Sequence, residues 1–178
     1  MKKVLIVSTS PRMNSNSEAL ANAFADGARE AGHAAEVITL RGKTIQFCRG
    51  CFVCQEKLRC VIRDDADVIC QKAVDADVLV FATPIYYYEM SGQLKTLLDR
   101  MNPLFPSDYA FRDVYLLTSA AEDEEHVPQR AVSGVEGWVE CFERAQLAGT
   151  VFMGGVTAAG ENPQHPALEL AYRMGKNV

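Results

Sequence analysis

Short apolar runs alternate with longer amphipathic segments along the chain. The apolar runs are four to six residues long and rich in β-branched residues. This pattern is typical of strands that are buried on both faces of a parallel sheet. We therefore predict strands at Val4–Val7, Ala35–Leu40, Val78–Ala82, Asp113–Thr118 and Thr150–Met153.

The segments between these strands repeat apolar residues at helical spacing. From Leu94 to Met101, and again from Val135 to Phe142, apolar residues follow the i, i+3, i+4, i+7 rule. Five such strand–helix units predict a single α/β domain over residues 1–178. The expected architecture is a flavodoxin-like, doubly wound, five-stranded parallel sheet of order 2-1-3-4-5 with helices on both faces, whose ligands bind at the carboxyl ends of strands 1 and 3. We predict helices at Asn16–Ala31, Asp65–Val74, Gly92–Met101, Gln129–Ala148 and Pro166–Met174.

Composition narrows the class of protein. A chain of 178 residues with 48% hydrophobic and 23% charged residues fits one ordinary globular domain. Its net charge of −5 gives no general attraction to nucleic acid. We see no signal peptide and no apolar run near the ~20 residues that span a bilayer, so we expect a cytoplasmic protein without membrane contact. Cytoplasmic thiols stay reduced, which makes the six cysteines ligands, reactive thiols or buried side chains.

Polar residues crowd the loop that follows the first predicted strand. Between Ser8 and Ser17 it holds four serines, a threonine and Arg12. Free N–H groups and the helix dipole favour a phosphate at such a position. Ser15 and Glu18 could instead form a capping box that needs no ligand, but a cap uses one hydroxyl only. The loop lacks G-x-G-x-x-G, and the chain lacks G-x-x-x-x-G-K-[ST], which argues against a dinucleotide fingerprint and an NTPase.

Three tyrosines, Tyr86–Tyr88, follow the third predicted strand after Pro84. Aromatic side chains at the mouth of a parallel sheet suit a flat ring, although they could also cover a sheet edge or a subunit interface. A phosphate loop and an aromatic loop on neighbouring strands together describe a mononucleotide with a large flat head, which is FMN.

Four cysteines lie in the long connection at about residues 41–63, which we interpret as a loop insertion. Loops of this length within a compact domain are usually functional. The spacing C-x2-C-x2-C-x5-C can wrap one compact [4Fe–4S] cluster, while zinc, redox-active free thiols and inert cysteines remain alternatives. Six basic residues and one acid in this segment would stabilise thiolates, or form a solvated basic loop. The four cysteines are Cys48, Cys51, Cys54 and Cys60, whereas Cys70 and Cys141 are expected to be buried in helices.

The segments STSPRMNSNSEAL and ATPIYYYEMSGQLKTLLDR resemble the NADPH-dependent FMN reductase family of flavodoxin-like proteins. The segment CRGCFVCQEKLRC, followed by Asp64 and Asp65, resembles its iron–sulfur flavoprotein branch. The resemblance covers about residues 1–100. It implies a phosphate site and an isoalloxazine site, with the loop after the fourth strand closing the ring's other edge. The implied residues are Ser10, Arg12, Asn16 and Ser17 for the phosphate, Pro84, Ile85, Tyr86 and Tyr87 along the ring, and Ser119 at its other edge.

The expected function is that of an FMN-dependent oxidoreductase or electron-transfer flavoprotein. The flavin performs the redox chemistry, so no catalytic side chain is required. In one version FMN exchanges electrons with a [4Fe–4S] cluster and a soluble carrier or oxidant. In a second version NAD(P)H reduces the flavin, which then reduces a quinone, a free flavin or another small acceptor. The competing class is a non-enzymatic module with structural zinc.

We also expect a homo-oligomer, a dimer or a tetramer. Relatives of this fold commonly complete the flavin pocket with a neighbouring chain, and the tyrosine run is more aromatic than a monomer's ligand loop needs.

Overall fold

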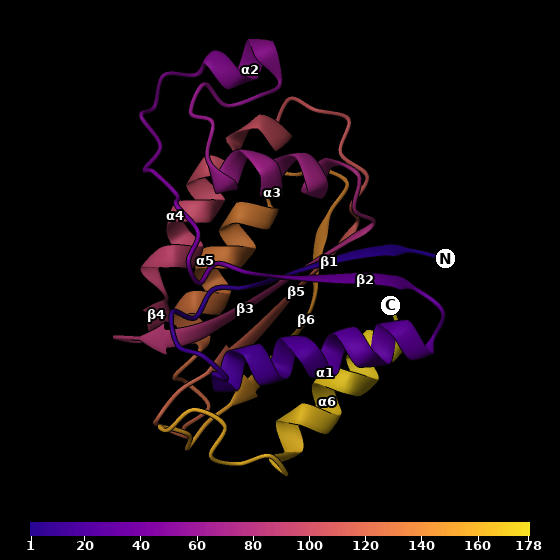
Figure 1. Ribbon diagram of the computed structural model, residues 1–178, viewed down its shortest axis with the longest axis vertical. Coiled ribbons are helices and arrows are strands. Elements are labelled where there is room, and N and C mark those ends of the chain that lie inside the picture. The colour runs from indigo at the N-terminus through magenta and orange to yellow at the C-terminus, as the bar shows by residue number, and fades with distance from the viewer.

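The computed structural model describes residues 1–178 and has a parallel sheet at its centre. Its strands follow the order β2-β1-β3-β5-β6, so the predicted 2-1-3-4-5 order of five parallel strands is confirmed (Figure 1). A sixth strand, β4, was not predicted; it has two residues and pairs antiparallel with the end of β3. The strands are β1 (Lys3–Ser8), β2 (Ala34–Thr39), β3 (Val78–Tyr86), β4 (Glu89–Met90), β5 (Asp113–Ser119) and β6 (Gln146–Met153).

Helices cover both faces of the sheet (Figure 1). Helices α1 and α6 lie together on one face, and α3, α4 and α5 lie on the other. None of the helices is both long and apolar enough for a membrane span. The helices are α1 (Asn16–Glu30), α2 (Val53–Lys57), α3 (Asp65–Val74), α4 (Gly92–Arg100), the short 3₁₀ helix η1 (Asn102–Leu104), α5 (Gln129–Val139) and α6 (Pro166–Lys176).

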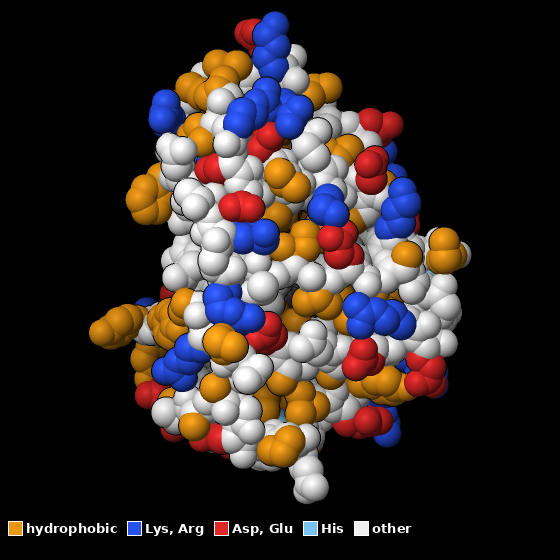
Figure 2. All heavy atoms as spheres, viewed as in Figure 1, with side chains coloured by type: hydrophobic (Ala, Val, Ile, Leu, Met, Phe, Trp, Pro, Cys, Tyr) orange, Lys and Arg blue, Asp and Glu red, His pale blue; other side chains and the backbone are white.

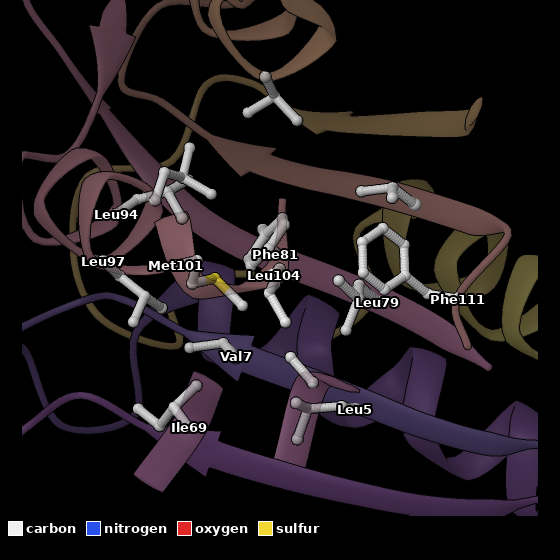
Figure 3. Packing of buried hydrophobic residues seen from close by; sticks show 14 of the residues in the cluster. Leu5, Val7, Ile69, Leu79, Phe81, Leu94, Leu97, Met101, Leu104 and Phe111 are labelled. Atoms are coloured by element: carbon white, nitrogen blue, oxygen red, sulfur yellow. The ribbon is translucent and has the colours of Figure 1, made fainter. Parts of the chain in front are cut away.

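Alternation along the strands builds one core on each face of the sheet. Leu5 and Val7 of β1 point to the α3–α4–α5 side, whereas Val4 and Ile6 point to the α1–α6 side. Figure 3 shows the first core, where Phe81 of β3 lies beside Met101 and Leu104, which follow α4. Two buried faces explain why the strands read as nearly continuous apolar runs.

Strand pairing brings three loops to one edge of the sheet. Ser8 at the end of β1 pairs with Ala82 of β3, and Pro84 further along β3 pairs with Ser119 at the end of β5. The carboxyl ends of these strands therefore meet at the edge where a doubly wound sheet binds ligands.

The region from α5 to β6 differs from the prediction. Helix α5 ends at Val139, not at Ala148, and β6 begins at Gln146, not at Thr150. The helical pattern continued to Phe142 because its side chain still enters the core from the turn after α5. Cys141 lies in this turn and is exposed, so the prediction that it is buried was wrong, whereas Cys70 is buried as predicted. The first half of β6 escaped prediction because an edge strand needs few apolar residues.

Candidate functional site

A cavity of about 190 Å³ lies at the carboxyl ends of β1, β3 and β5. Eight of the nine residues expected to bind the cofactor line it, although they come from three separate parts of the chain. These residues are Ser10, Arg12, Asn16, Ser17, Pro84, Ile85, Tyr86 and Ser119. We call this space the strand-end cavity.

Tyr87 is the ninth expected residue and does not line the strand-end cavity. Tyr86 pairs with Glu89, so Tyr87 and Tyr88 form the two-residue turn between β3 and β4. Both turn residues have positive φ, 52° and 65°, as a tight hairpin turn of this length requires. The Tyr87 side chain is 98% exposed at the tip of this hairpin, which projects from the left of the molecule in Figure 1. The Tyr88 ring stacks on His126 at a centroid distance of 5.8 Å.

A helix cap accounts for only part of the loop after β1. Ser15 caps α1, because its hydroxyl accepts a hydrogen bond from the Glu18 N–H at 3.1 Å. The Glu18 carboxylate does not complete a capping box and instead pairs with Arg41. Ser10 and Ser17 are buried at the strand-end cavity and are not needed for the cap. Their hydroxyls and the free N–H groups of α1 suit an anionic oxygen group.

Buried hydroxyls join this loop to β3 and α4. Ser91, the N-cap of α4, lies 3.0 Å from the Thr9 hydroxyl and accepts a hydrogen bond from the Thr83 hydroxyl at 3.1 Å. The Ser91 N–H also donates to the Thr83 hydroxyl. All three side chains are buried, so the network holds the wall of the strand-end cavity in one arrangement.

The loop after β6 also lines the strand-end cavity, through Val156 and Thr157 among others, and was not predicted. The Arg12 guanidinium donates to the Thr157 carbonyl at 2.7 Å, and the Asn16 amide donates to the Ala158 carbonyl at 2.9 Å. These bonds use backbone acceptors, which any residue can supply. The only sequence signal available was the position of the loop, directly after the strand beside β5.

The cysteine loop, residues 41–63, rises to the top of the molecule in Figure 1 and contains only the short helix α2. A buried arginine fastens its base. Arg100 donates to the Gln46 carbonyl at 2.7 Å and to the Ile62 carbonyl at 3.1 Å, on either side of the four cysteines. It also forms a two-pronged ion pair with Asp64, at 2.7 and 2.9 Å.

The Arg100–Asp64 pair is almost fully withdrawn from water, with side-chain exposures of 0% and 5%. Burial raises the pKa of the Asp64 carboxyl, but hydrogen bonds from Arg100 and from the Gln46 N–H outweigh it, and the net pKa is lowered. Asp64 also accepts from the Ala66 N–H as the N-cap of α3. One carboxylate thus joins the loop to α3 and α4.

All four loop cysteines line a second cavity of about 440 Å³, which we call the cysteine cavity. Cys54 is buried, Cys60 is partly exposed, and Cys48 and Cys51 are exposed. No group of three or more His, Cys, Asp or Glu side chains is close enough together to hold a metal ion. The thiols therefore share one space without being gathered at one point.

Nitrogen donors accompany the sulfur atoms. The Asn102 amide donates to Cys54 Sγ at 3.0 Å. The Nε atom of Arg100 is buried and has no hydrogen-bond partner. Four soft thiol ligands with N–H donors beside them fit an anionic iron–sulfur or zinc site in their chemistry.

The positive charge of the cysteine loop is partly neutralised by acids outside it. Figure 2 shows Lys and Arg side chains gathered at the top of the molecule, over α2 and the start of α3. Arg59 and Arg63 both pair with Asp67 of α3, at 2.8 and 3.2 Å, and the Asp67 carboxylate is only 4% exposed. These arginines hold the loop against α3. Because Asp67 neutralises part of their charge, the positive electrostatic potential at the thiols is weaker than the number of basic residues in the loop suggests.

The two cavities lie at opposite ends of α4 and share no lining residue. Ser91 at its N-terminus belongs to the hydroxyl network behind the strand-end cavity, whereas Asn102, just beyond its C-terminus, contacts Cys54. At a rise of 1.5 Å per residue, the helix places Ser91 and Asn102 roughly 15 Å apart.

Comparisons with known proteins agree with these features. A family model described as NADPH-dependent FMN reductase matches residues 2–155. An iron-sulfur flavoprotein of Methanocaldococcus jannaschii is 38% identical over 102 residues, which cover 57% of this chain and 53% of that protein. The chain thus spans about half the length of that relative. An iron-sulfur flavoprotein of Methanosarcina thermophila is 26% identical over 156 residues, 87% of this chain and 82% of that protein.

The fold also matches solved structures. The NAD(P)H:quinone oxidoreductase from Methanothermobacter marburgensis aligns with a TM-score of 0.73 at 20% identity, over 99% of this chain and 98% of that one. At this identity the likeness is one of fold.

Proposed function

Because the chain belongs to the NADPH-dependent FMN reductase family, we propose that it is an FMN-dependent oxidoreductase whose flavin binds in the strand-end cavity. One observation carries the proposal. Eight residues that the family resemblance implied for a flavin site, from three distant segments, line a single cavity at the ligand-binding edge of the sheet.

Each part of the cavity has a role in holding FMN. The phosphate would lie at the N-terminus of α1, where the Ser10 and Ser17 hydroxyls and the Arg12 guanidinium can donate to it. Pro84, Ile85 and Tyr86 supply apolar and aromatic surface for the ring, and Ser119, at the end of β5, lies beside Pro84 on the neighbouring strand. When bound, the flavin supplies the redox chemistry, and the protein binds it, orients it and limits access of water.

The cysteine cavity supports a second part of the proposal, a [4Fe–4S] cluster ligated by Cys48, Cys51, Cys54 and Cys60. Its support is the shared cavity of the four thiols, the donors at Asn102 and Arg100, and the iron-sulfur flavoprotein name of similar proteins. A cluster passes electrons one at a time, so together with a flavin it would connect two-electron and one-electron partners.

We propose NAD(P)H or a soluble redox carrier as electron donor and a quinone, a free flavin or another small oxidant as acceptor. We place the protein in the cytoplasm, because reduced thiols need a reducing compartment. We also propose a dimer or tetramer, because relatives of this fold commonly complete the flavin pocket with a neighbouring chain. Without a cluster the same chain would be a plain NAD(P)H-dependent flavin or quinone reductase. With zinc at the thiols and no flavin it would be a binding module.

The deciding experiment is purification without oxygen, followed by a visible spectrum and assays of FMN, iron, acid-labile sulfide and zinc. Cys54→Ser should remove the brown absorption while bound FMN remains, because the two cavities are separate. Cys141→Ser is the matched control, since this exposed thiol lies outside both cavities. About four iron and four sulfide per chain support the cluster. Stoichiometric zinc, or no metal, contradicts the cluster, and absence of FMN contradicts the oxidoreductase.

A further inference from the structure

Two nitrogen donors lie at the C-terminal end of α4, where the cysteine loop is anchored, and neither was indicated by the sequence. The first is Asn102, whose side-chain amide donates to Cys54 Sγ at 3.0 Å. Cys54 is the only one of the four thiols that is buried. A buried sulfur has little water to solvate it, so this amide is a substantial part of its polar surroundings.

The second donor is Arg100. Its two Nη atoms are occupied by Asp64 and by the carbonyls of Gln46 and Ile62, while its Nε has no partner although it is buried. A buried N–H without an acceptor is destabilising, and such groups are rare in folded proteins. One Nη atom donates to the Ile62 carbonyl, so the guanidinium contacts the loop two residues after Cys60.

We propose that Asn102 and Arg100 are donors to the sulfur ligands of the cysteine cavity and that they raise the reduction potential of the iron–sulfur group held there. This inference rests on the proposed function of the four thiols. Hydrogen bonds to ligand sulfurs favour the more negative, reduced state, because they stabilise the added negative charge. The ion pair with Asp64 fixes the position of the Arg100 guanidinium, so Nε would be available to a group held by the cysteines.

The test compares three variants with the wild type, all purified without oxygen. Asn102→Ala removes the donor, and Asn102→Asp replaces it with a negatively charged acceptor of nearly the same shape. Asn177→Asp makes the same chemical change at an exposed position in the last turn of the chain. The readout is a redox titration followed by the visible and electron paramagnetic resonance spectra, which needs no turnover.

We expect Asn102→Ala to lower the equilibrium constant for one-electron reduction about fivefold, and Asn102→Asp to lower it at least tenfold, equivalent to about 59 mV. Asn177→Asp should match the wild type. Arg100→Lys, which keeps the charge but loses Nε, should also lower the potential. Because Arg100→Lys also perturbs the base of the cysteine loop, the inference is judged by the reduction potentials of the two Asn102 variants.

Each outcome has a defined meaning. An unchanged potential in Asn102→Ala and Asn102→Asp, with iron and sulfide at the wild-type content, overturns the inference and leaves the proposed function intact. Loss of the cluster from Asn102→Ala also overturns it, because a donor that only tunes the potential is not needed for assembly. A wild type that contains neither iron nor sulfide overturns the inference together with the cluster.

Discussion

Replacing Arg100 by methionine should release the base of the cysteine loop and lower the free energy of unfolding by about 3–5 kcal/mol. Methionine is chosen because it is long, flexible and apolar, so it can fill the space of a side chain that is 0% exposed. The substitution removes both prongs of the ion pair with Asp64 and the donors to the Gln46 and Ile62 carbonyls.

The magnitude follows from what is left behind. The Asp64 carboxylate, 5% exposed, loses its counter-charge, and removing one partner of a buried pair costs about 3–5 kcal/mol. A second substitution, Asp64→Asn, removes the stranded charge and keeps one of the two oxygens that accept from the Ala66 and Gln46 N–H groups. The free energy of unfolding of the double variant Arg100→Met/Asp64→Asn should therefore be about 1–3 kcal/mol higher than the value expected by adding the losses of the two single variants.

Urea unfolding followed by circular dichroism measures these free energies on the protein without added metal. Limited proteolysis reports the local effect, and cleavage should begin between Gln46 and Ile62 in Arg100→Met. Lys95→Met is the matched control, since Lys95 lies on the same helix in an exposed pair with Asp99 and should change stability by less than about 0.5 kcal/mol. A loss below about 1 kcal/mol in Arg100→Met, or strictly additive single variants, would refute the reasoning.

Three further predictions concern other parts of the molecule. Arg12→Ala should weaken FMN binding roughly 10- to 100-fold in a fluorescence titration, because a charged donor to phosphate is lost, while the exposed Arg29→Ala should bind like the wild type. Burial raises the pKa of Asp67, but hydrogen bonds from Arg59 and Arg63 outweigh it, so the pKa in the folded protein is lowered. The ionised Asp67 therefore stabilises the fold fully above an unfolded pKa of about 4, and this stabilisation is lost as the pH falls through the lower folded pKa. Asp67→Asn should therefore make the unfolding temperature, measured from pH 6 to pH 3, depend less on pH. Gly27→Ala should destabilise the fold by about 3 kcal/mol, because its Cβ would meet the Tyr172 carbonyl between α1 and α6, whereas Gly137→Ala, with open space around its Cβ, should be neutral or stabilising in the same denaturant titration.

The sequence was sufficient to predict the sheet and most of the strand-end cavity, for a physical reason. Strands buried on both faces must be apolar throughout, and the topology then brings the ends of β1, β3 and β5 to one edge. Polar residues such as Ser10 and Arg12 directly after an apolar strand were therefore assigned to a shared site without knowledge of any contact. The family resemblance implied that Tyr87 lies along the flavin ring, but the chain turns at Tyr87 and Tyr88, which leaves the Tyr87 side chain exposed at the tip of the hairpin.

Other features have no local signature. The loop after β6 meets Arg12 and Asn16 through carbonyl oxygens, which every residue carries. Arg100 is a charged residue in α4, and the pattern of polar and apolar residues predicts an exposed side chain there. Arginine is almost never fully buried unless it is paired. Its partner Asp64 is 36 residues away, and only the assembled fold brings the two together.

Helix α4 gives the two cavities a common rigid support. Its N-cap, Ser91, is fixed by the buried hydroxyls behind the strand-end cavity, and Arg100 at its other end fixes the base of the cysteine loop. Its inner face is fully packed, with Leu94 and Leu97 buried against the sheet, as Figure 3 shows. A helix held at both ends and along one face cannot shift at one cavity without moving at the other. Substitutions of surface residues within either cavity should therefore act locally, whereas loosening the packing of α4, for example by Leu97→Ala, should disturb flavin affinity and the cysteine site together.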